Sequence, residues 1–125
     1  MAKKVMVVDD EPYIARVIKF KLEQEGYTVV SANDGITGLE KIRQEKPQLV
    51  LLDVMMPGLS GYEVCQKIKA DAELAGIPVV FLTAKGQERD REQGLAIGAS
   101  DYITKPFSPN RLLELVRTMI GGAKE

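Results

Sequence analysis

The sequence predicts an α/β domain in which a doubly wound parallel sheet of five strands packs between five helices. Two observations support this: short apolar runs recur along the chain, and longer segments with helical patterns separate them. Runs that are apolar at every position are typical of strands buried on both faces, as in a parallel sheet. Each gap has room for one crossover helix. The apolar runs cover residues 5–8, 27–30, 49–52, 79–82 and, more weakly, 102–103.

The first two intervening segments have clear helix signals. Pro12 suits the first turn of a helix, and apolar residues keep helical spacing after it until Gly26. In the second segment, Ile36 begins an apolar stripe at helical spacing that stops before Pro47. Such a stripe is typical of the face that a helix turns to a core.

The remaining helices have signals of unequal strength. Ser60 and Glu63 have the spacing of a capping box, and Ser108 precedes a proline and another apolar stripe. The fourth helix, residues 87–97, is the weakest, because it starts with seven polar residues and Gly94 interrupts it. We expect few buried contacts there, and therefore the most mobile helix of the domain.

The composition fits one globular domain, residues 1–125, with a core of its own. Lys and Arg number 17 and Asp and Glu 18, so the net charge of −1 gives no electrostatic basis for direct binding of nucleic acid or of a membrane surface. No apolar run could span a bilayer, and no secretory signal is recognisable at the start. Cys65 is the single cysteine, which fits the reducing cytoplasm.

The sequence contains no histidine. This excludes histidine-based catalytic triads, histidine-ligated zinc and histidine general bases within the chain. A metal site would therefore depend on oxygen ligands, which suit hard cations such as magnesium, calcium or manganese.

Chemically active residues follow the predicted strands. Asp9 and Asp10 follow the first run, Asp53 the third, Thr83 the fourth, and Lys105 the fifth. Because the carboxyl ends of parallel strands meet at one edge of the sheet, these side chains should share a single rim.

Taken singly, each of these residues has a simpler explanation: aspartates and threonines often cap helices, and a lysine in a loop is often only solvated. Taken together, three carboxylates at one edge would repel one another unless a cation intervened. A divalent cation removes that cost, and one carboxylate could then act as a nucleophile towards phosphorus. Lys105 and the Thr83 hydroxyl would bind the phosphoryl oxygens.

The residues at this rim resemble the receiver domain of two-component response regulators. The resemblance covers essentially the whole chain, in order, spacing and position at the strand ends. It implies a flavodoxin-like, three-layer fold with strand order 2-1-3-4-5. The motifs that carry it are Val7-Val8-Asp9-Asp10-Glu11-Pro12, Leu51-Leu52-Asp53-Val54-Met55-Met56-Pro57-Gly58, Leu82-Thr83-Ala84 and Lys105-Pro106-Phe107.

The resemblance implies that Asp53 is the phosphoacceptor and that Mg²⁺, or alternatively Mn²⁺, is the cofactor. Asp10 and Asp53 would bind the ion directly, with the backbone carbonyl of Met55 as a further ligand. Asp9 would bind it directly or through water.

The resemblance also assigns the phosphoryl contacts and a switch. Thr83, Lys105 and the backbone of Ala84 would contact the phosphoryl group, and Thr83 would move towards it while Tyr102 turns inward. A half-buried strand residue is an equally good interpretation of Tyr102. The peptide bond between Lys105 and Pro106 is expected to be cis.

The resemblance implies a non-enzymatic switch whose phosphoryl donor is a histidine kinase or a phosphotransfer protein. Its target would be a downstream protein or output domain, reached through the fourth helix, fifth strand and fifth helix, and a homodimer through that face is left open.

Three alternative functions also stay open: a phosphorylation-independent binding module, a small magnesium phosphatase and a flavodoxin-like electron carrier. Met55 argues against the phosphatase, since such enzymes usually carry a second acid at that position. The acidic loop after the first strand argues against a flavin site.

Overall fold

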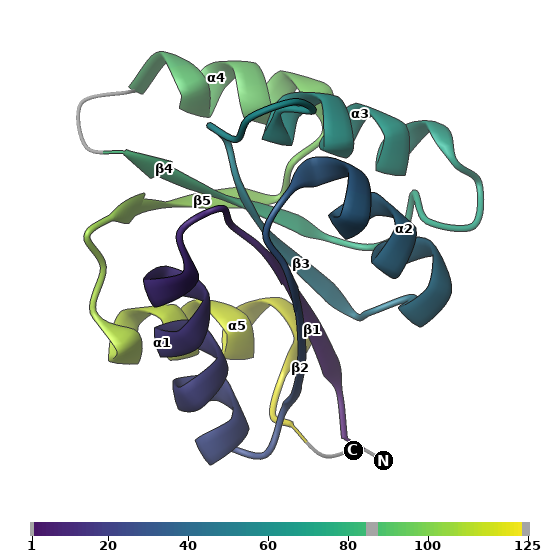
Figure 1. The fold of residues 1–125 in the computed structure, drawn as a ribbon. Helices are drawn as coiled ribbons and strands as arrows, with labels where there is room; N and C mark the ends of the chain where they lie inside the picture. Colours follow the sequence, from purple (N-terminus) through teal and green to yellow (C-terminus); the bar gives the residue numbers. More distant parts are fainter. Residues whose placement is uncertain (1, 85–87, 124–125) are drawn as a thin grey trace.

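Five strands and five helices alternate within residues 2–84 and 88–123, which the computed structural model describes (Figure 1). Of residues 88–91 only the backbone is described. In chain order the elements are β1 (Lys4–Val8), α1 (Pro12–Gln24), β2 (Thr28–Ala32), α2 (Gly35–Glu45), β3 (Leu49–Asp53), α3 (Gly61–Ala70), β4 (Val79–Ala84), α4 (Glu88–Ile97), β5 (Asp101–Lys105) and α5 (Pro109–Ile120).

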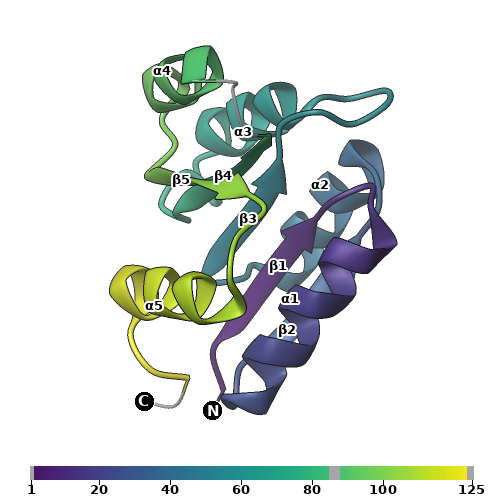
Figure 2. The ribbon, with the colours of Figure 1, turned by 90° about the vertical axis from the view of Figure 1, so that its left-hand side faces the viewer.

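The strands form one parallel sheet in the order β2-β1-β3-β4-β5. Helices α1 and α5 cover one face of the sheet, and α2, α3 and α4 cover the other (Figure 1). The predicted fold class, strand order and flavodoxin-like layering are therefore confirmed. Figure 2 shows the two ends of the chain side by side, where the Lys3 amide donates a 2.8 Å hydrogen bond to the Ala123 carbonyl.

The core consists of two apolar clusters, one on each face of the sheet. In β1, Val5 and Val7 belong to the cluster under α1 and α5, whereas Met6 and Val8 belong to the cluster under α2, α3 and α4. Successive side chains of a strand point to opposite faces, and here both faces are covered by helices. This explains why the central strands β1, β3 and β4 have runs of consecutive apolar residues rather than alternating ones. The edge strands β2 and β5 are more polar.

The helix ends follow the predicted signals closely. Ser60 and Glu63 form the capping box of α3, and the Ser108 hydroxyl accepts a hydrogen bond from the Arg111 amide at the start of α5. The sequence interpretation missed one cap: the Asp34 carboxylate accepts a 2.7 Å hydrogen bond from the Thr37 amide and begins α2.

Two local predictions need correction. The spacing puts Ile36 on the apolar stripe of α2, but 60 % of it is exposed. The buried face of this helix carries Gly35, Gly38, Leu39 and Ile42, and Ile36 lies to one side of that face. The second strand begins at Thr28 rather than at residue 27, since the Tyr27 amide still bonds to the Leu22 carbonyl at the end of α1.

The fourth helix forms, and its described part runs from Glu88 to Ile97. Residue 87, where the prediction began, lies outside the described residues. Gly94 does not interrupt the helix: it is buried, and a Cβ atom built there would lie 2.6 Å from Cδ2 of Phe81. The glycine lets α4 approach β4 closely. None of the helices in the described ranges combines the length and the apolar character needed to cross a membrane.

Candidate functional site

The predicted rim residues meet at the carboxyl edge of the sheet. Asp9 directly follows β1, Asp53 is the last residue of β3, and Thr83 and Ala84 end β4. Lys105 ends β5 and pairs in register with Ala84. The expectation that strand ends would bring these residues to one edge holds because all the strand pairs are parallel.

Lys105 lies among three carboxylates. Its Nζ is 2.8 Å from Oδ2 of Asp9, 3.3 Å from Oε1 of Glu11 and 3.6 Å from Oδ2 of Asp53. Burial by itself would lower the pKa of Lys105, but the hydrogen bond to Asp9 and the charge of Asp53 outweigh it and raise that pKa above its usual value. Lys105 therefore stays an ammonium ion and is the positive charge of the rim.

Asp9 is the most deeply buried acid of the site, with no exposed surface. Its Oδ1 accepts a 2.9 Å hydrogen bond from the Glu11 amide. Its Oδ2 faces the Lys105 ammonium and accepts no other hydrogen bond among the described residues. A buried carboxylate oxygen without a full set of donors has coordination capacity to spare.

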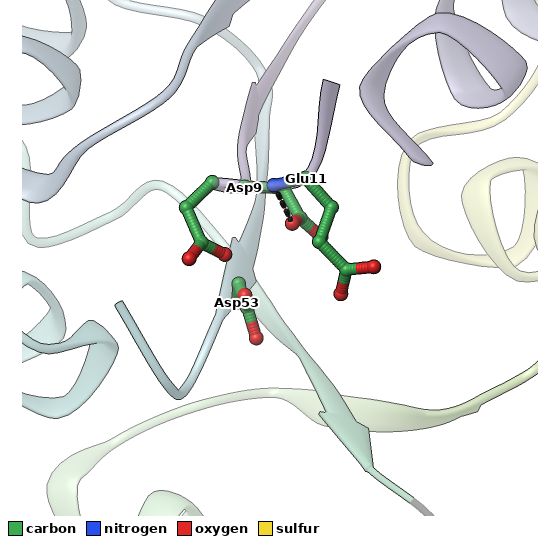
Figure 3. A group of neighbouring side chains, drawn as sticks. Asp9, Glu11 and Asp53 are labelled. Carbon is green, nitrogen blue, oxygen red and sulfur yellow. Dashed lines mark hydrogen bonds between the residues drawn. The ribbon is translucent and has the colours of Figure 1, made fainter. Parts of the chain in front are cut away.

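Four carboxylates form a tight acidic cluster: one oxygen from each of Asp9, Asp10, Glu11 and Asp53 lies within 4.8 Å of the others. Figure 3 shows Asp9 and Glu11, on the loop after β1, close to Asp53 at the end of β3. Asp10 and Glu11 are exposed, whereas Asp9 and Asp53 are buried. One lysine therefore faces four acids, and the site has an excess of negative charge.

The pKa of Asp53 is raised from its usual 3.8 to about 7. Burial is the largest cause, followed by the negative charge of Asp9, and the neighbouring Asp10 carboxyl adds to them. Two groups lower the pKa of Asp53 without cancelling this rise. One is the Lys105 ammonium, and the other is the Met55 amide, which donates a 3.3 Å hydrogen bond to Oδ1 of Asp53.

The donor set fits a hard divalent cation. All four candidate ligands in the cluster are carboxylates, which magnesium and manganese prefer. Such a cation would relieve the repulsion that raises the pKa of Asp53, and it would use the unsatisfied oxygen of Asp9. The Met55 side chain is exposed, and the contact that this residue makes with Asp53 comes from its backbone amide.

The predicted phosphoryl-binding and switch residues surround the acids from β4 and β5. Thr83 is 4 % exposed and pairs in register with Thr104, while Ala84 is exposed at the end of the strand. Tyr102 is a half-buried strand residue packed against the cluster under α2, α3 and α4. The peptide bond between Lys105 and Pro106 is cis, as the resemblance implied.

Gly61 holds the loop after Asp53 in place by close packing. The resemblance to receiver domains also implies turn glycines at Gly58 and Gly61. Gly58 has a φ of 76°, but the φ of Gly61 is not positive, so Gly61 is not a glycine of this kind. A Cβ built on Gly61 would lie 2.2 Å from the Asp53 carbonyl oxygen. The Gly61 amide also donates a 3.0 Å hydrogen bond to the Val54 carbonyl. The start of α3 thus rests directly on the backbone of Asp53.

The sequence interpretation left Glu11 out of the candidate site residues. The structure adds it, because its carboxylate contacts Lys105 and belongs to the acidic cluster. The available signal was the run of three acids at residues 9–11, which places a third carboxylate within reach of any group held by the first two.

The response regulator receiver domain family matches residues 5–117. Solved structures agree. The chemotaxis response regulator CheY4 of Vibrio cholerae is 28 % identical, with 96 % of this chain and 100 % of that chain covered and a TM-score of 0.90. The receiver domain of NtrX from Brucella abortus is 30 % identical (93 % and 97 % covered, TM-score 0.87). The signal receiver domain of a signal transduction histidine kinase from Syntrophus aciditrophicus is 33 % identical (99 % and 94 % covered, TM-score 0.88).

Proposed function

This chain belongs to the response regulator receiver domain family, and on that premise we propose that it is the phosphoacceptor switch of a two-component phosphorelay. Asp53 is the acceptor. The observation that carries this proposal is the position of Asp53: it ends β3 inside an acidic cluster, with the Lys105 ammonium 3.6 Å from its Oδ2. Asp53 is the only carboxylate of the cluster that is itself the last residue of a strand.

The proposed reaction is a phosphoryl transfer from a phosphohistidine. A carboxylate oxygen of Asp53 forms a bond to phosphorus while the bond between phosphorus and the donor's imidazole nitrogen breaks. The bonding electron pair stays on the imidazole, which takes up a proton. The donor is a histidine kinase or a phosphotransfer protein, because this chain has no histidine of its own.

Residues around Asp53 would stabilise the transferred group. Mg²⁺, with Mn²⁺ as a substitute, would be held by Asp10, Asp53, the Met55 carbonyl and Asp9, directly or through water, and would supply positive charge beside the phosphoryl oxygens. Lys105 supplies a second positive charge, and it is already held at the rim by Asp9.

Donors from β4 complete the proposed contacts. The Thr83 hydroxyl and the Ala84 amide would donate hydrogen bonds to the phosphoryl oxygens.

In this proposal the cation also affects the protonation of Asp53. The pKa of Asp53 is about 7 without it, so near neutral pH much of this residue is protonated, and a nearby positive charge favours the ionised, nucleophilic form.

The signal would leave the site through Thr83 and Tyr102. We propose that Thr83 moves towards the phosphoryl group, and that Tyr102, on the neighbouring strand, turns further into the interior, which alters the α4–β5–α5 surface. A downstream protein or an output domain would read that surface, and homodimers could form through it. The chain would act as a switch in the cytoplasm, without an external substrate of its own.

The decisive experiment is intact mass after incubation with acetyl phosphate and MgCl₂. We expect one phosphoryl adduct on the wild type and none on Asp53→Asn. Asp71→Asn, which changes a distant acid in the same way, should keep the adduct. Asp10→Asn, or EDTA, should reduce it strongly. An adduct that survives Asp53→Asn would overturn the assignment of the acceptor.

The same samples separate the alternatives. If the wild type takes no phosphoryl group from acetyl phosphate or from histidine kinases, the chain is a phosphorylation-independent binding module. Rapid multiple turnover of a small phosphoester such as p-nitrophenyl phosphate would instead identify a phosphatase. The proposed switch requires an adduct without such turnover.

A further inference from the structure

A pocket with a volume of about 390 Å³ lies beside the loop after β1, and Asp9 and Pro12 are among the residues that line it. It opens where the chain passes from β2, an edge strand, into α2. Helices α1 and α2 lie on opposite faces of the sheet and both reach this edge (Figure 1). The side chains and backbone that could bind a ligand there come from Arg16, Lys19, Ser31, Asn33, Thr37 and Lys41.

Three cationic side chains line this one pocket in a protein whose net charge is −1. Arg16 and Lys19 come from α1 and Lys41 from α2. None of the three has an ion pair among the described residues, although Lys4, Lys46, Lys105 and Arg117 all do. Three uncompensated cations around one hollow repel one another, and a bound anion would remove that repulsion.

The acids nearby do not provide that compensation. Asp9 lines the pocket, but its charge is already paired with Lys105. Asp34 senses the charge of Lys41, yet its carboxylate is half-buried and already caps α2 through the Thr37 amide. Lys41 is held in place by a 2.7 Å hydrogen bond to the Ser31 carbonyl, which leaves two further ammonium hydrogens for a ligand.

We infer that this pocket binds a small soluble anion with two linked phosphate groups. Arg16 can hold one phosphate through two parallel hydrogen bonds, and the two lysines supply compact charges for the other. The hydroxyl of Thr37 and the amide of Asn33 add neutral donors. The volume is within the range of small-molecule sites, and larger than a single phosphate needs. Binding here does not involve Asp53, which is not among the residues that line the pocket.

The test is calorimetric titration of the full chain with sodium pyrophosphate, in EDTA so that no cation bridges the anion to Asp53. We expect saturable binding of one pyrophosphate. The double variant Arg16→Gln/Lys19→Gln should weaken it about tenfold or more, as expected for the loss of two charge-assisted contacts. Lys21→Gln removes a charge from the same helix outside the pocket and should change the affinity less than about twofold.

Each other outcome overturns the inference. Absence of saturable binding excludes the site, and equal weakening by Lys21→Gln reduces it to general charge attraction. Binding to vesicles of anionic phospholipid without binding of pyrophosphate would identify a membrane surface instead of a soluble ligand. Because Arg16 and Lys19 are exposed, both variants should keep the wild-type melting temperature, which serves as the check on folding. Asp53→Asn should bind pyrophosphate normally, so this test and that of the phosphoacceptor fail independently.

Discussion

At the scale of single residues, the site depends on one ammonium ion and an excess of carboxylates. Lys105 approaches Asp9 more closely than Asp53, at 2.8 Å against 3.6 Å. Asp53 is therefore only partly neutralised, and its pKa stays near 7. A buried acid in this condition destabilises the folded protein when it ionises, and it becomes available to other positive charges.

The first prediction concerns the pH dependence of stability. The folded pKa of Asp53, about 7, lies above the usual 3.8, so the folded state binds the proton more tightly. The contribution of Asp53 to the free energy of unfolding therefore falls as pH rises from about 4 to about 7, and is level above that. Asp53→Asn cannot ionise. In EDTA it should match the wild type near pH 4 and be more stable by roughly 1–3 kcal/mol at pH 8.

Urea denaturation of both proteins at both pH values measures the difference in unfolding free energy. If the difference in unfolding free energy between Asp53→Asn and the wild type is the same at pH 4 and pH 8, the raised pKa is refuted. For Asp71→Asn, the corresponding difference should not depend on pH in this way.

The second prediction concerns competition between Lys105 and a metal ion. Both need the oxygens of Asp9 and Asp53. Lys105→Gln removes the competing charge, so Mg²⁺ affinity should rise about fivefold, in keeping with the loss of one partly buried ion pair. Calorimetric titration with MgCl₂ gives the dissociation constants. Lys67→Gln, an exposed lysine on α3, is the matched control and should leave the affinity unchanged. Weaker Mg²⁺ binding by Lys105→Gln would show that the lysine organises the acids instead of competing for them.

At the scale of helices and strands, two glycines set the distance between a helix and the sheet. Gly61 allows α3 to begin against the backbone of Asp53, and Gly94 allows α4 to lie against Phe81. Both approaches are too close for a Cβ atom. The first fixes the loop that carries Met55, and the second sets the position of a helix that belongs to the proposed output surface.

The third prediction tests the contact at Gly61. Gly61→Ala would put a methyl group against the Asp53 carbonyl, so α3 or the loop must shift. We expect a loss of about 2–4 kcal/mol in unfolding free energy and weaker Mg²⁺ binding. Gly76→Ala is the control, since no atom lies within 4 Å of its added Cβ, and it should cost less than about 1 kcal/mol. Equal effects of the two substitutions would mean that the start of α3 adapts freely.

The fourth prediction tests the contact at Gly94. An alanine in a helix normally adds up to about 1 kcal/mol over a glycine. Here its Cβ would lie 2.6 Å from Cδ2 of Phe81, and that ring is also packed edge-on against Tyr62. Gly94→Ala should therefore lower the unfolding free energy of the protein by roughly 1–2 kcal/mol. Shortening the partner in Gly94→Ala/Phe81→Leu should relieve the clash, which a double-mutant cycle by urea denaturation would reveal as a favourable coupling. Additive effects would contradict the proposed close packing.

At the scale of the whole molecule, the sheet joins the site to both cores. Strands β3, β4 and β5 each contribute a residue to the site, and Asp9 directly follows β1. The same four strands carry apolar side chains of both clusters. Relief of the repulsion among the acids should therefore stabilise the entire domain and not only one loop, because small domains unfold cooperatively.

The fifth prediction follows from this coupling. MgCl₂ at 10 mM should raise the melting temperature of the wild type by several degrees, since an ion that binds only the folded state adds about RT ln(1 + [Mg²⁺]/Kd). NaCl at equal ionic strength should raise it much less. Asp10→Asn should lose most of the magnesium effect, whereas Asp71→Asn should keep it. An equal response of all three proteins would assign the stabilisation to general screening.

The sequence by itself determined the class of fold and most of the site. Apolar runs identified the strands, because short runs of consecutive apolar residues between longer helical patterns are typical of strands covered on both faces. The ends of those runs then gave Asp9, Asp53, Thr83 and Lys105 as neighbours, since parallel strands end at the same edge. The strand order came from the resemblance to receiver domains and not from spacing.

Only the tertiary structure decided the distances. It brought Lys105 closer to Asp9 than to Asp53, added Glu11 to the site, and made Gly61 a point of close approach instead of a turn. It also gathered the cations of α1 and α2 around one pocket. The physical reason is that periodicity along a chain reports which side of an element is buried, whereas the separation of two atoms depends on how elements pair and pack across the sheet.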